Sequence, residues 1–190
     1  MKQAKTLTQT ELRRVLDYIA TRKHAARNRA VVLMTYYAGM RVGEVAALKI
    51  ADIIDTEGQI KNEIRLTAEQ TKGNTARVIM VSEKLRKELA TYSKTLSYKD
   101  TSHSFFYTQK QHKRGFTANT LAQFFYTLYN NAGLEGASSH SGRRSFITNL
   151  AAKGVSVRVL MSLAGHQNIS TTQAYIDIND DMKRKAVELI

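Results

Sequence analysis

The amino-acid sequence predicts an α+β fold that is mostly α-helical, with one small antiparallel β-sheet. Apolar residues recur at helical spacing through most of the 190-residue chain, and only the stretch 60–81 alternates between apolar and polar residues as strands do. The content of 43% hydrophobic and 24% charged residues is typical of a globular protein. Because proline and Gly/Ser-rich linkers are absent, we expect one domain over residues 1–190.

The first predicted helix begins at Leu7 or Thr8, where Thr8 and Glu11 match a capping box. Its apolar face then recurs at helical spacing in Leu12, Val15, Leu16 and Ile19. The charged stretch 22–29 is expected to end this helix.

Two further helices are predicted before residue 50. The first runs from about Asn28 to Ala38 and is more apolar, so it is expected to be more buried. Gly39 is a natural left-handed stop for it. A short helix from Val42 to about Lys49 follows.

The stretch 60–81 predicts a hairpin with a long tip. Ile64 and Leu66 alternate with polar residues, 70–76 is a polar turn, and 77–81 is rich in residues that favour strands. This hairpin accounts for the small antiparallel sheet.

Helical spacing returns in four later segments. Their apolar residues are Leu85 and Leu89; Leu121, Phe124, Phe125 and Leu128; Phe146, Ile147 and Leu150; and Val159, Leu160 and Leu163. Thr117 and Ser156 are placed to cap the N-termini of such helices. Gly133, Gly154 and Gly165 are placed to end them. The segment 180–190 carries an apolar stripe and is expected to form a C-terminal tail or helix.

Charge is the strongest compositional signal. Lys and Arg number 29 against 16 Asp and Glu, so the net charge is +13, which favours a polyanionic partner such as nucleic acid. The longest apolar stretch, 30–40, is too short to cross a bilayer, and the polar N-terminus shows no signal peptide. We therefore expect a cytoplasmic protein without a membrane partner.

Several chemistries lack the residues they need. The chain has no cysteine, which excludes zinc ribbons and cysteine nucleophiles. It also has no G-x-x-x-x-G-K-[ST] phosphate loop, no H-E-x-x-H motif and no acidic cluster suited to two metal ions. We expect neither a metal nor a cofactor.

Two segments near the C-terminus stand out. The first, His140-Ser141-Gly142-Arg143, opens a helical apolar pattern. The H-x-x-R spacing recurs from His24 to Arg27, which we interpret as a solvated helix end. The second segment reads Gly165-His166-Gln167-Asn168-Ile169-Ser170-Thr171-Thr172-Gln173-Ala174-Tyr175.

That second segment closely resembles the G-H-x-x-I-x-T-T-x-x-Y signature of tyrosine recombinases, the phage integrase family. The segment 39–48 is similar to the one that carries the family's first catalytic arginine, and 70–73 to the turn that carries its catalytic lysine. The resemblance extends from about Leu7 to Asp180 and implies the tyrosine recombinase catalytic-domain fold.

The resemblance implies six catalytic residues: Arg41, Lys72, His140, Arg143, His166 and Tyr175. Two arginines suit a phosphodiester because they grip its oxygens bidentately with charges that do not titrate, and histidines can donate or relay protons. The counterpart of Tyr175 forms a 3′-phosphotyrosyl bond, and the counterpart of Lys72 protonates the departing 5′ oxygen. Glu44 matches an acidic position that supports the site.

The implied activity is site-specific DNA recombination of the integrase or invertase type, independent of metal and ATP. Type IB topoisomerase-like relaxation uses the same chemistry, and a non-catalytic DNA-binding regulator could share the fold. The implied partners are double-stranded DNA carrying a specific recombination site, three further copies in a tetramer, and possible DNA-bending accessory proteins.

Most family members carry a separate N-terminal core-binding domain, for which this chain shows no counterpart. The chain either resembles the small single-domain members, such as fimbrial phase-switch invertases, or is a catalytic fragment of a longer integrase. Members of the family exchange C-terminal segments, so 180–190 is expected to dock on another protomer, or to fold back on its own core.

Overall fold

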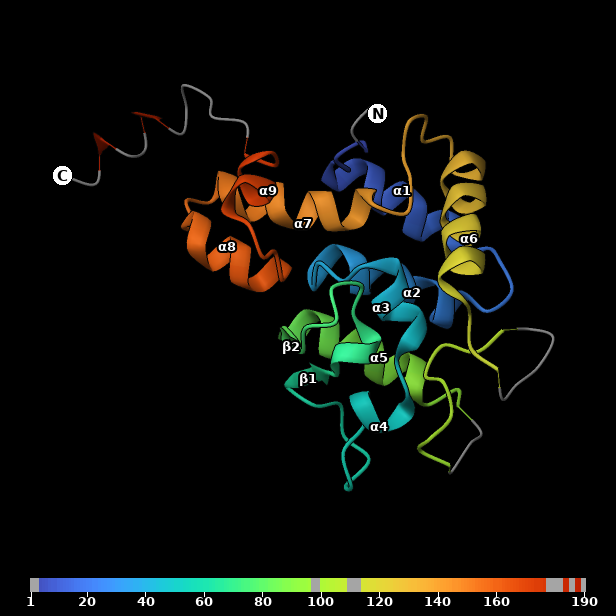
Figure 1. Cartoon of the computed structure of the whole chain (residues 1–190). Coiled ribbons are helices and arrows are strands. Elements are labelled where there is room, and N and C mark those ends of the chain that lie inside the picture. Colours follow the sequence, from blue (N-terminus) through green and yellow to red (C-terminus); the bar gives the residue numbers. More distant parts are fainter. Residues whose placement is uncertain (1–3, 97–99, 109–113, 177–182, 185–186, 189–190) are drawn as a thin grey trace.

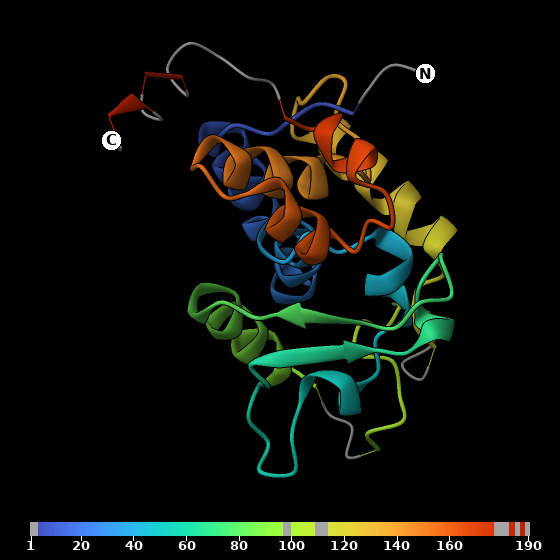
Figure 2. The ribbon, with the colours of Figure 1, turned by 60° about the vertical axis from the view of Figure 1, so that its left-hand side comes forward.

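The computed structural model of the chain describes residues 4–96, 100–108, 114–176, 183–184 and 187–188. The described residues form helices packed around α2 (Ala25–Tyr37), with one two-stranded sheet on their flank (Figures 1 and 2). The predicted fold class is thereby confirmed. None of the helices in the described ranges is long and apolar enough to cross a membrane.

Helix α2 is central because it is apolar on almost every side. Its buried residues run from Arg27 to Tyr36 and include Val31 to Met34 in succession. The helices that pack most extensively against it are α1 (Gln9–Ala20), α5 (Glu83–Ser93) and α7 (Ser141–Ala152). The predicted Thr8–Glu11 capping box starts α1, since the Thr8 side chain accepts from the Glu11 amide and the Glu11 side chain accepts from the Thr8 amide.

The hairpin forms as predicted, with β1 (Glu63–Leu66) antiparallel to β2 (Arg77–Met80). Ile64 pairs with Ile79, and both are buried against the helices. A short 3₁₀ helix, η1 (Ala68–Gln70), opens the turn. Figure 2 shows the two strands lying along one side of the helical part of the molecule.

The remaining helices are α3 (Val42–Ala47), α4 (Ile50–Ile53), α6 (Ala118–Asn131), α8 (Val157–Ala164) and α9 (Ile169–Gln173). Helix α3 packs on α6, and α8 packs on α7, α9 and β2. The glycines predicted to end helices have positive φ, as shown by Gly39 at 61°, Gly133 at 70°, Gly154 at 82° and Gly165 at 61°. Side chains at Thr117 and Ser156 cap α6 and α8 as predicted.

Three details of the prediction are wrong. Helix α2 begins at Ala25 rather than Asn28, and α3 ends at Ala47 because Leu48 is already extended, with ψ of 134°. Arg27 is not at a solvated helix end. It is 5% exposed, and its Nη1 donates to the Tyr107 carbonyl over 2.9 Å while its guanidinium lies 5.1 Å from the centre of the Phe116 ring.

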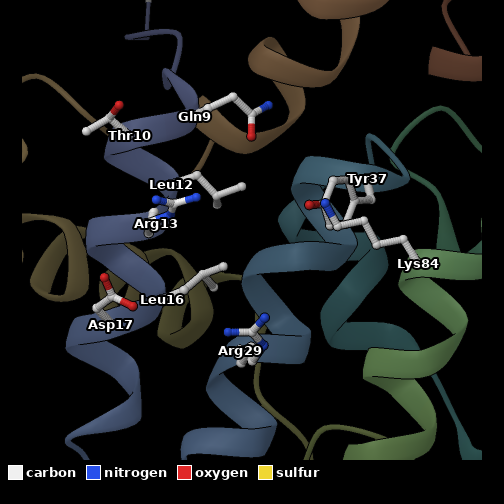
Figure 3. Close-up of a pocket in the computed structure, with 9 residues that line it drawn as sticks. All are labelled: Gln9, Thr10, Leu12, Arg13, Leu16, Asp17, Arg29, Tyr37 and Lys84. Carbon is white, nitrogen blue, oxygen red and sulfur yellow. The ribbon is translucent and has the colours of Figure 1, made fainter.

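A cavity of about 430 Å³ lies where α1, α2 and α5 meet (Figure 3). Arg13, Arg29 and Lys84 contribute its basic side chains. Arg29 is paired bidentately with Glu88, at 2.7 Å for both contacts. None of the six predicted catalytic residues lines this cavity.

Candidate active site

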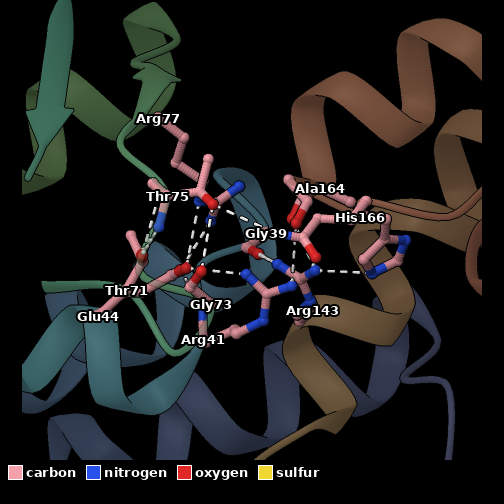
Figure 4. A network of polar contacts seen from close by, with 12 residues as sticks. Gly39, Arg41, Glu44, Thr71, Gly73, Thr75, Arg77, Arg143, Ala164 and His166 are labelled. Atoms are coloured by element: carbon pink, nitrogen blue, oxygen red, sulfur yellow. Dashed lines mark hydrogen bonds and ion pairs between the residues drawn. The ribbon is translucent and has the colours of Figure 1, made fainter. Parts of the chain in front are cut away.

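Three arginines from different elements converge on the C-terminal end of α8 (Figure 4). They donate to three consecutive carbonyls: Arg77 to Leu163 over 2.9 Å, Arg143 to Ala164 over 2.7 Å, and Arg41 to Gly165 over 3.1 Å. The carbonyls at the end of a helix lack partners within it and carry partial negative charge, so cations are stabilising there. We call Arg41, Arg77, Arg143 and Glu44 the arginine centre.

Arg143 is the most enclosed of the three, at 4% exposure. Besides Ala164, it donates from Nη1 to the Gly39 carbonyl over 2.6 Å. Helix α7 reaches this position because Gly142 packs directly on α2, where an added Cβ would lie 2.1 Å from Thr35 Oγ1. Burial, together with the charges of Arg41 and Arg77, lowers the pKa of Arg143 to about 9, which leaves the guanidinium charged at neutral pH.

Glu44 is the carboxylate of the centre, at 1% exposure. It accepts from Arg41 Nη1 over 2.9 Å and from Arg77 Nη2 over 2.7 Å. It also accepts from the Arg41 amide, which fixes the start of α3. Burial alone would raise the pKa of Glu44, but the charge of Arg77 and then that of Arg41 outweigh it and hold the pKa below its ordinary value.

His166 lies between the arginine centre and α9. Its Nε2 is 2.8 Å from Arg143 Nη2, and its Nδ1 is 2.9 Å from Thr172 Oγ1. Because a guanidinium only donates, Nε2 is the acceptor and Nδ1 carries the proton, which it donates to Thr172. Burial and the charges of Arg143, Arg41 and Arg77 lower the pKa of His166 to about 4, so the imidazole is neutral at neutral pH.

Tyr175 follows α9 and packs on the site within the same chain. Its ring stacks on His166 with centroids 5.6 Å apart and planes at 26°. The guanidinium carbon of Arg144 lies 5.3 Å from the centre of the same ring. Thr148 Oγ1 donates to the Tyr175 carbonyl over 3.2 Å and so ties this segment to α7.

His140 and Lys72 each line a cavity of about 530 Å³ beside the arginine centre. One cavity is lined by His140, Arg144 and Tyr175, and the other by Lys72, Arg41 and His166. Lys72 is exposed on the turn 71–75. Partial burial, followed by the charges of Arg143, Lys72 and Arg41, lowers the pKa of His140 and favours its neutral form.

The structure thus brings all six predicted residues to the arginine centre or to the two cavities beside it. Two contributors were not singled out from the sequence, Arg77 and Thr172. Arg77 lies two residues before buried Ile79 on β2, so both side chains point to the inward face of the strand. A charged residue at such a core-facing position could have indicated a functional contact. Thr172 is fully buried and holds His166, although its motif alone gives no sign of that contact.

The chain belongs to the phage integrase family, whose sequence pattern matches residues 5–182. Tyrosine recombinase XerA of Thermococcus kodakarensis is 33% identical over 186 residues, which cover 97% of this chain and 62% of that protein. Tyrosine recombinase XerD of Rickettsia conorii is 32% identical over 176 residues, covering 85% of this chain and 55% of that protein. The chain spans about 60% of the length of the XerA relatives it matches.

Solved structures share the fold. The crystal structure of XerA recombinase matches with a TM-score of 0.77 at 24% identity, covering 100% of this chain and 66% of that one. XerH site-specific recombinase bound to its difH substrate matches with a TM-score of 0.69 at 26% identity, covering 98% of this chain and 54% of that one. The similarity to the XerA structure covers the whole chain and shows that the two proteins share one fold.

Proposed function

We propose that this chain is the catalytic part of a site-specific DNA recombinase of the integrase or invertase type. The observation that carries the proposal is the convergence of Arg41 and Arg143 beside the ring pair of His166 and Tyr175. An anion clamp next to a tyrosine is the arrangement that transfer of a phosphodiester to a protein hydroxyl requires. XerH, a relative in fold, is seen with its recombination substrate, which supports DNA as the partner.

The chemistry proposed is an exchange of one ester bond for another. The Tyr175 oxygen attacks the scissile phosphorus, the bond from phosphorus to the 5′ oxygen breaks, and a 3′-phosphotyrosyl bond forms. His140, held in its neutral form, takes the tyrosine proton, and Lys72 gives a proton to the departing 5′ oxygen. In the reverse step a 5′ hydroxyl of the partner strand gives its proton to Lys72 and attacks the phosphorus. The bond from phosphorus to the Tyr175 oxygen breaks, Tyr175 recovers its proton from His140, and the DNA is rejoined.

The clamp residues stabilise the charge that develops on the non-bridging oxygens. Arg143 is already fixed by three contacts, so it needs little reorganisation when the phosphate enters. His166 accepts from Arg143 and thereby fixes the plane of its guanidinium. The phosphotyrosine conserves the energy of the bond it replaces, and the arginines supply the positive charge, so we propose that neither metal nor ATP takes part. Cleavage is expected to be unchanged by EDTA.

The proposed assembly is a homotetramer on two double-stranded DNA sites in the cytoplasm, with accessory DNA-bending proteins in some contexts. We propose that residues 1–190 act as one catalytic domain and that the segment 180–190 docks on a neighbouring protomer. Most of this segment lies outside the described residues. Deletion of 182–190 is expected to abolish synapsis while DNA binding by single protomers persists. Unchanged synapsis would show that the segment is not exchanged.

Covalent capture tests the proposed function. The protein is incubated with a randomised library of nicked duplexes and denatured in SDS, and the protein-linked DNA is recovered and sequenced beside Tyr175→Phe. Adducts that depend on Tyr175 and share one sequence are the expected result. Adducts without a consensus would favour topoisomerase-like relaxation. Tight DNA binding without any adduct would instead favour a non-catalytic regulator.

A further inference from the structure

Arg77 is the member of the arginine centre whose side chain donates to both carboxylate oxygens of Glu44. Nε and Nη2 donate to the two carboxylate oxygens of Glu44 over 3.1 and 2.7 Å, and Nη1 donates to the Leu163 carbonyl over 2.9 Å. Its side chain is 9% exposed. Unlike Arg143, whose contacts are to two carbonyls and His166, Arg77 directs two of its three nitrogens to the Glu44 carboxylate, so its role is expected to be exerted through the groups it holds.

The first of these groups is Glu44, which Arg77 shares with Arg41. A single buried carboxylate between two guanidiniums cannot neutralise both of them. If Arg77 were absent, Glu44 would be left with Arg41 as its only arginine, and the pair would be close to neutral. With Arg77 and Arg143 present, the arginine centre holds three guanidiniums and one carboxylate, and Arg143 donates to the Ala164 carbonyl rather than to Glu44. The centre then keeps two positive charges, which matches the two negative charges of a phosphodiester transition state.

The second group is the end of α8. Gly165 has φ of 61°, and an added Cβ there would lie 2.6 Å from the Arg77 Cδ. The Arg77 stem is thus packed against the turn that leads from α8 to His166. By holding the Leu163 carbonyl as well, Arg77 fixes the two carbonyls that follow, Ala164 and Gly165, on which Arg143 and Arg41 are oriented.

We propose that Arg77 is a positioning residue for DNA cleavage: it balances Glu44 and anchors the end of α8, so that Arg41 and Arg143 present their charge to the scissile phosphate. The inference rests on the proposed function, because it assigns Arg77 a part in that same reaction. It separates Arg77 from Lys72, whose expected part is with the leaving group and not with the non-bridging oxygens.

The test compares two substrates in single-turnover cleavage of a nicked duplex carrying the captured target site. One has the natural scissile phosphate, and the other has a methylphosphonate, in which a methyl group replaces one non-bridging oxygen and removes the negative charge. Arg77→Gln is expected to cleave the natural substrate about 100-fold more slowly than the wild type, as expected for a misplaced catalytic group. On the methylphosphonate the cleavage rates of the two proteins should differ by less than about 10-fold. Its transition state carries less negative charge, so the arginines stabilise it less.

The matched control is Arg65→Gln, an arginine on the paired strand whose side chain is 82% exposed. It should cleave both substrates at the wild-type rate. Circular dichroism melting shows whether each variant is folded. If Arg77→Gln is not folded, Arg77→Lys takes its place, since a lysine keeps the charge but cannot contact Glu44 and Leu163 together.

A loss of equal size on both substrates would show a merely structural role and overturn the inference, as would full activity of Arg77→Gln. Either result leaves the proposed function intact when the wild type forms its adduct. Absence of any wild-type adduct would overturn the proposed function, and the role of Arg77 in cleavage with it.

Discussion

The arginine centre and the turn 71–75 face the same cavity but are built in opposite ways. Arg143 is 4% exposed and bonded to Gly39, Ala164 and His166. Lys72 is exposed on a turn closed mainly by its own threonines, with Thr71 Oγ1 donating to the Thr75 carbonyl over 2.9 Å. The turn is joined to the opposite wall of the cavity by Gln167 Nε2, which donates to Thr75 Oγ1 over 3.2 Å.

The difference matches the two tasks proposed for these regions. Charge on the non-bridging oxygens is stabilised best by donors that are fixed before the substrate arrives. A proton donor has to approach a leaving oxygen whose position is set by the DNA, so an exposed lysine on a turn suits that step. Substitutions in the two regions should therefore differ in kind: those in the centre should affect both folding and cleavage, and those in the turn cleavage alone.

The largest effect is expected for Arg143→Lys. A lysine cannot reproduce the fork that contacts Gly39, Ala164 and His166, so we expect about a 1,000-fold loss of adduct formation. The unpaired carbonyls should also lower the free energy of unfolding by about 1–3 kcal/mol. Quenched-flow cleavage and urea titration measure the two effects. Arg158→Lys, on the exposed face of α8, is the control, and equal behaviour of the two variants would contradict a prebuilt clamp.

Lys72→Ala should reduce cleavage by about 100-fold, the usual scale for loss of a general acid, with no change in unfolding free energy. A substrate with sulfur in place of the bridging 5′ oxygen should restore most of the rate, because a thiolate leaves without being protonated. Lys87→Ala, exposed on α5, serves as the control. If the sulfur substrate gave no recovery, Lys72 would not be the proton donor.

Thr172→Val tests the link from α9 to His166. The substitution keeps the shape of a fully buried side chain but leaves the Nδ1 proton of His166 without its acceptor, which should cost about 1–3 kcal/mol of unfolding free energy. Cleavage should fall by less than in Arg143→Lys, since the Arg143 contacts to Gly39 and Ala164 remain. Urea unfolding of Thr171→Val, at an exposed position, provides the comparison, and similar stabilities would speak against the His166–Thr172 bond.

The last effect is a pH dependence of folding that is confined to mildly acidic solution. The pKa of His166 is lowered to about 4, below its ordinary value, so the unfolded chain binds more protons between about pH 4 and 6.5. Stability should therefore fall as pH is lowered through this window, by about 2 kcal/mol at pH 5. Urea titrations at pH 7, 6 and 5 should show a smaller decrease for His166→Gln. The same slope in both proteins would contradict a buried neutral imidazole.

Much of the fold could be predicted because most elements carry strong local signals. The capping box at Thr8, the alternation in the hairpin and the glycine stops all act within a few residues. The two short helices α4 and α9 were not predicted, since four or five residues are too few to show a helical period. Arg27 was predicted to lie at a solvated helix end. The burial of its side chain could not be foreseen, because its acceptor, the Tyr107 carbonyl, is 80 residues away in the chain.

The candidate site also contains residues that could be predicted from the sequence and features that could not. The six candidate catalytic residues could be proposed because their segments resemble the signature motifs of the phage integrase family, and the structure brings them to the arginine centre or to the cavities beside it. Arg77 belongs to none of the recognised motifs. Its importance comes from its contacts with Glu44 and the Leu163 carbonyl, which are far from it in the sequence. The neutral state of His166 also could not be anticipated, since it follows from burial next to Arg143 rather than from sequence.

The most direct measurement is to locate the bond between protein and DNA. Adducts formed on the captured site are trimmed with nuclease, digested with trypsin and analysed by mass spectrometry. Tyr175 is the only tyrosine between Arg158 and Lys183, so the peptide 159–183 should carry the residual nucleotide. That peptide should be unmodified, and the adduct absent, in Tyr175→Phe. A nucleotide on any other peptide, or an adduct that persists in Tyr175→Phe, would contradict the proposed cleavage at this site.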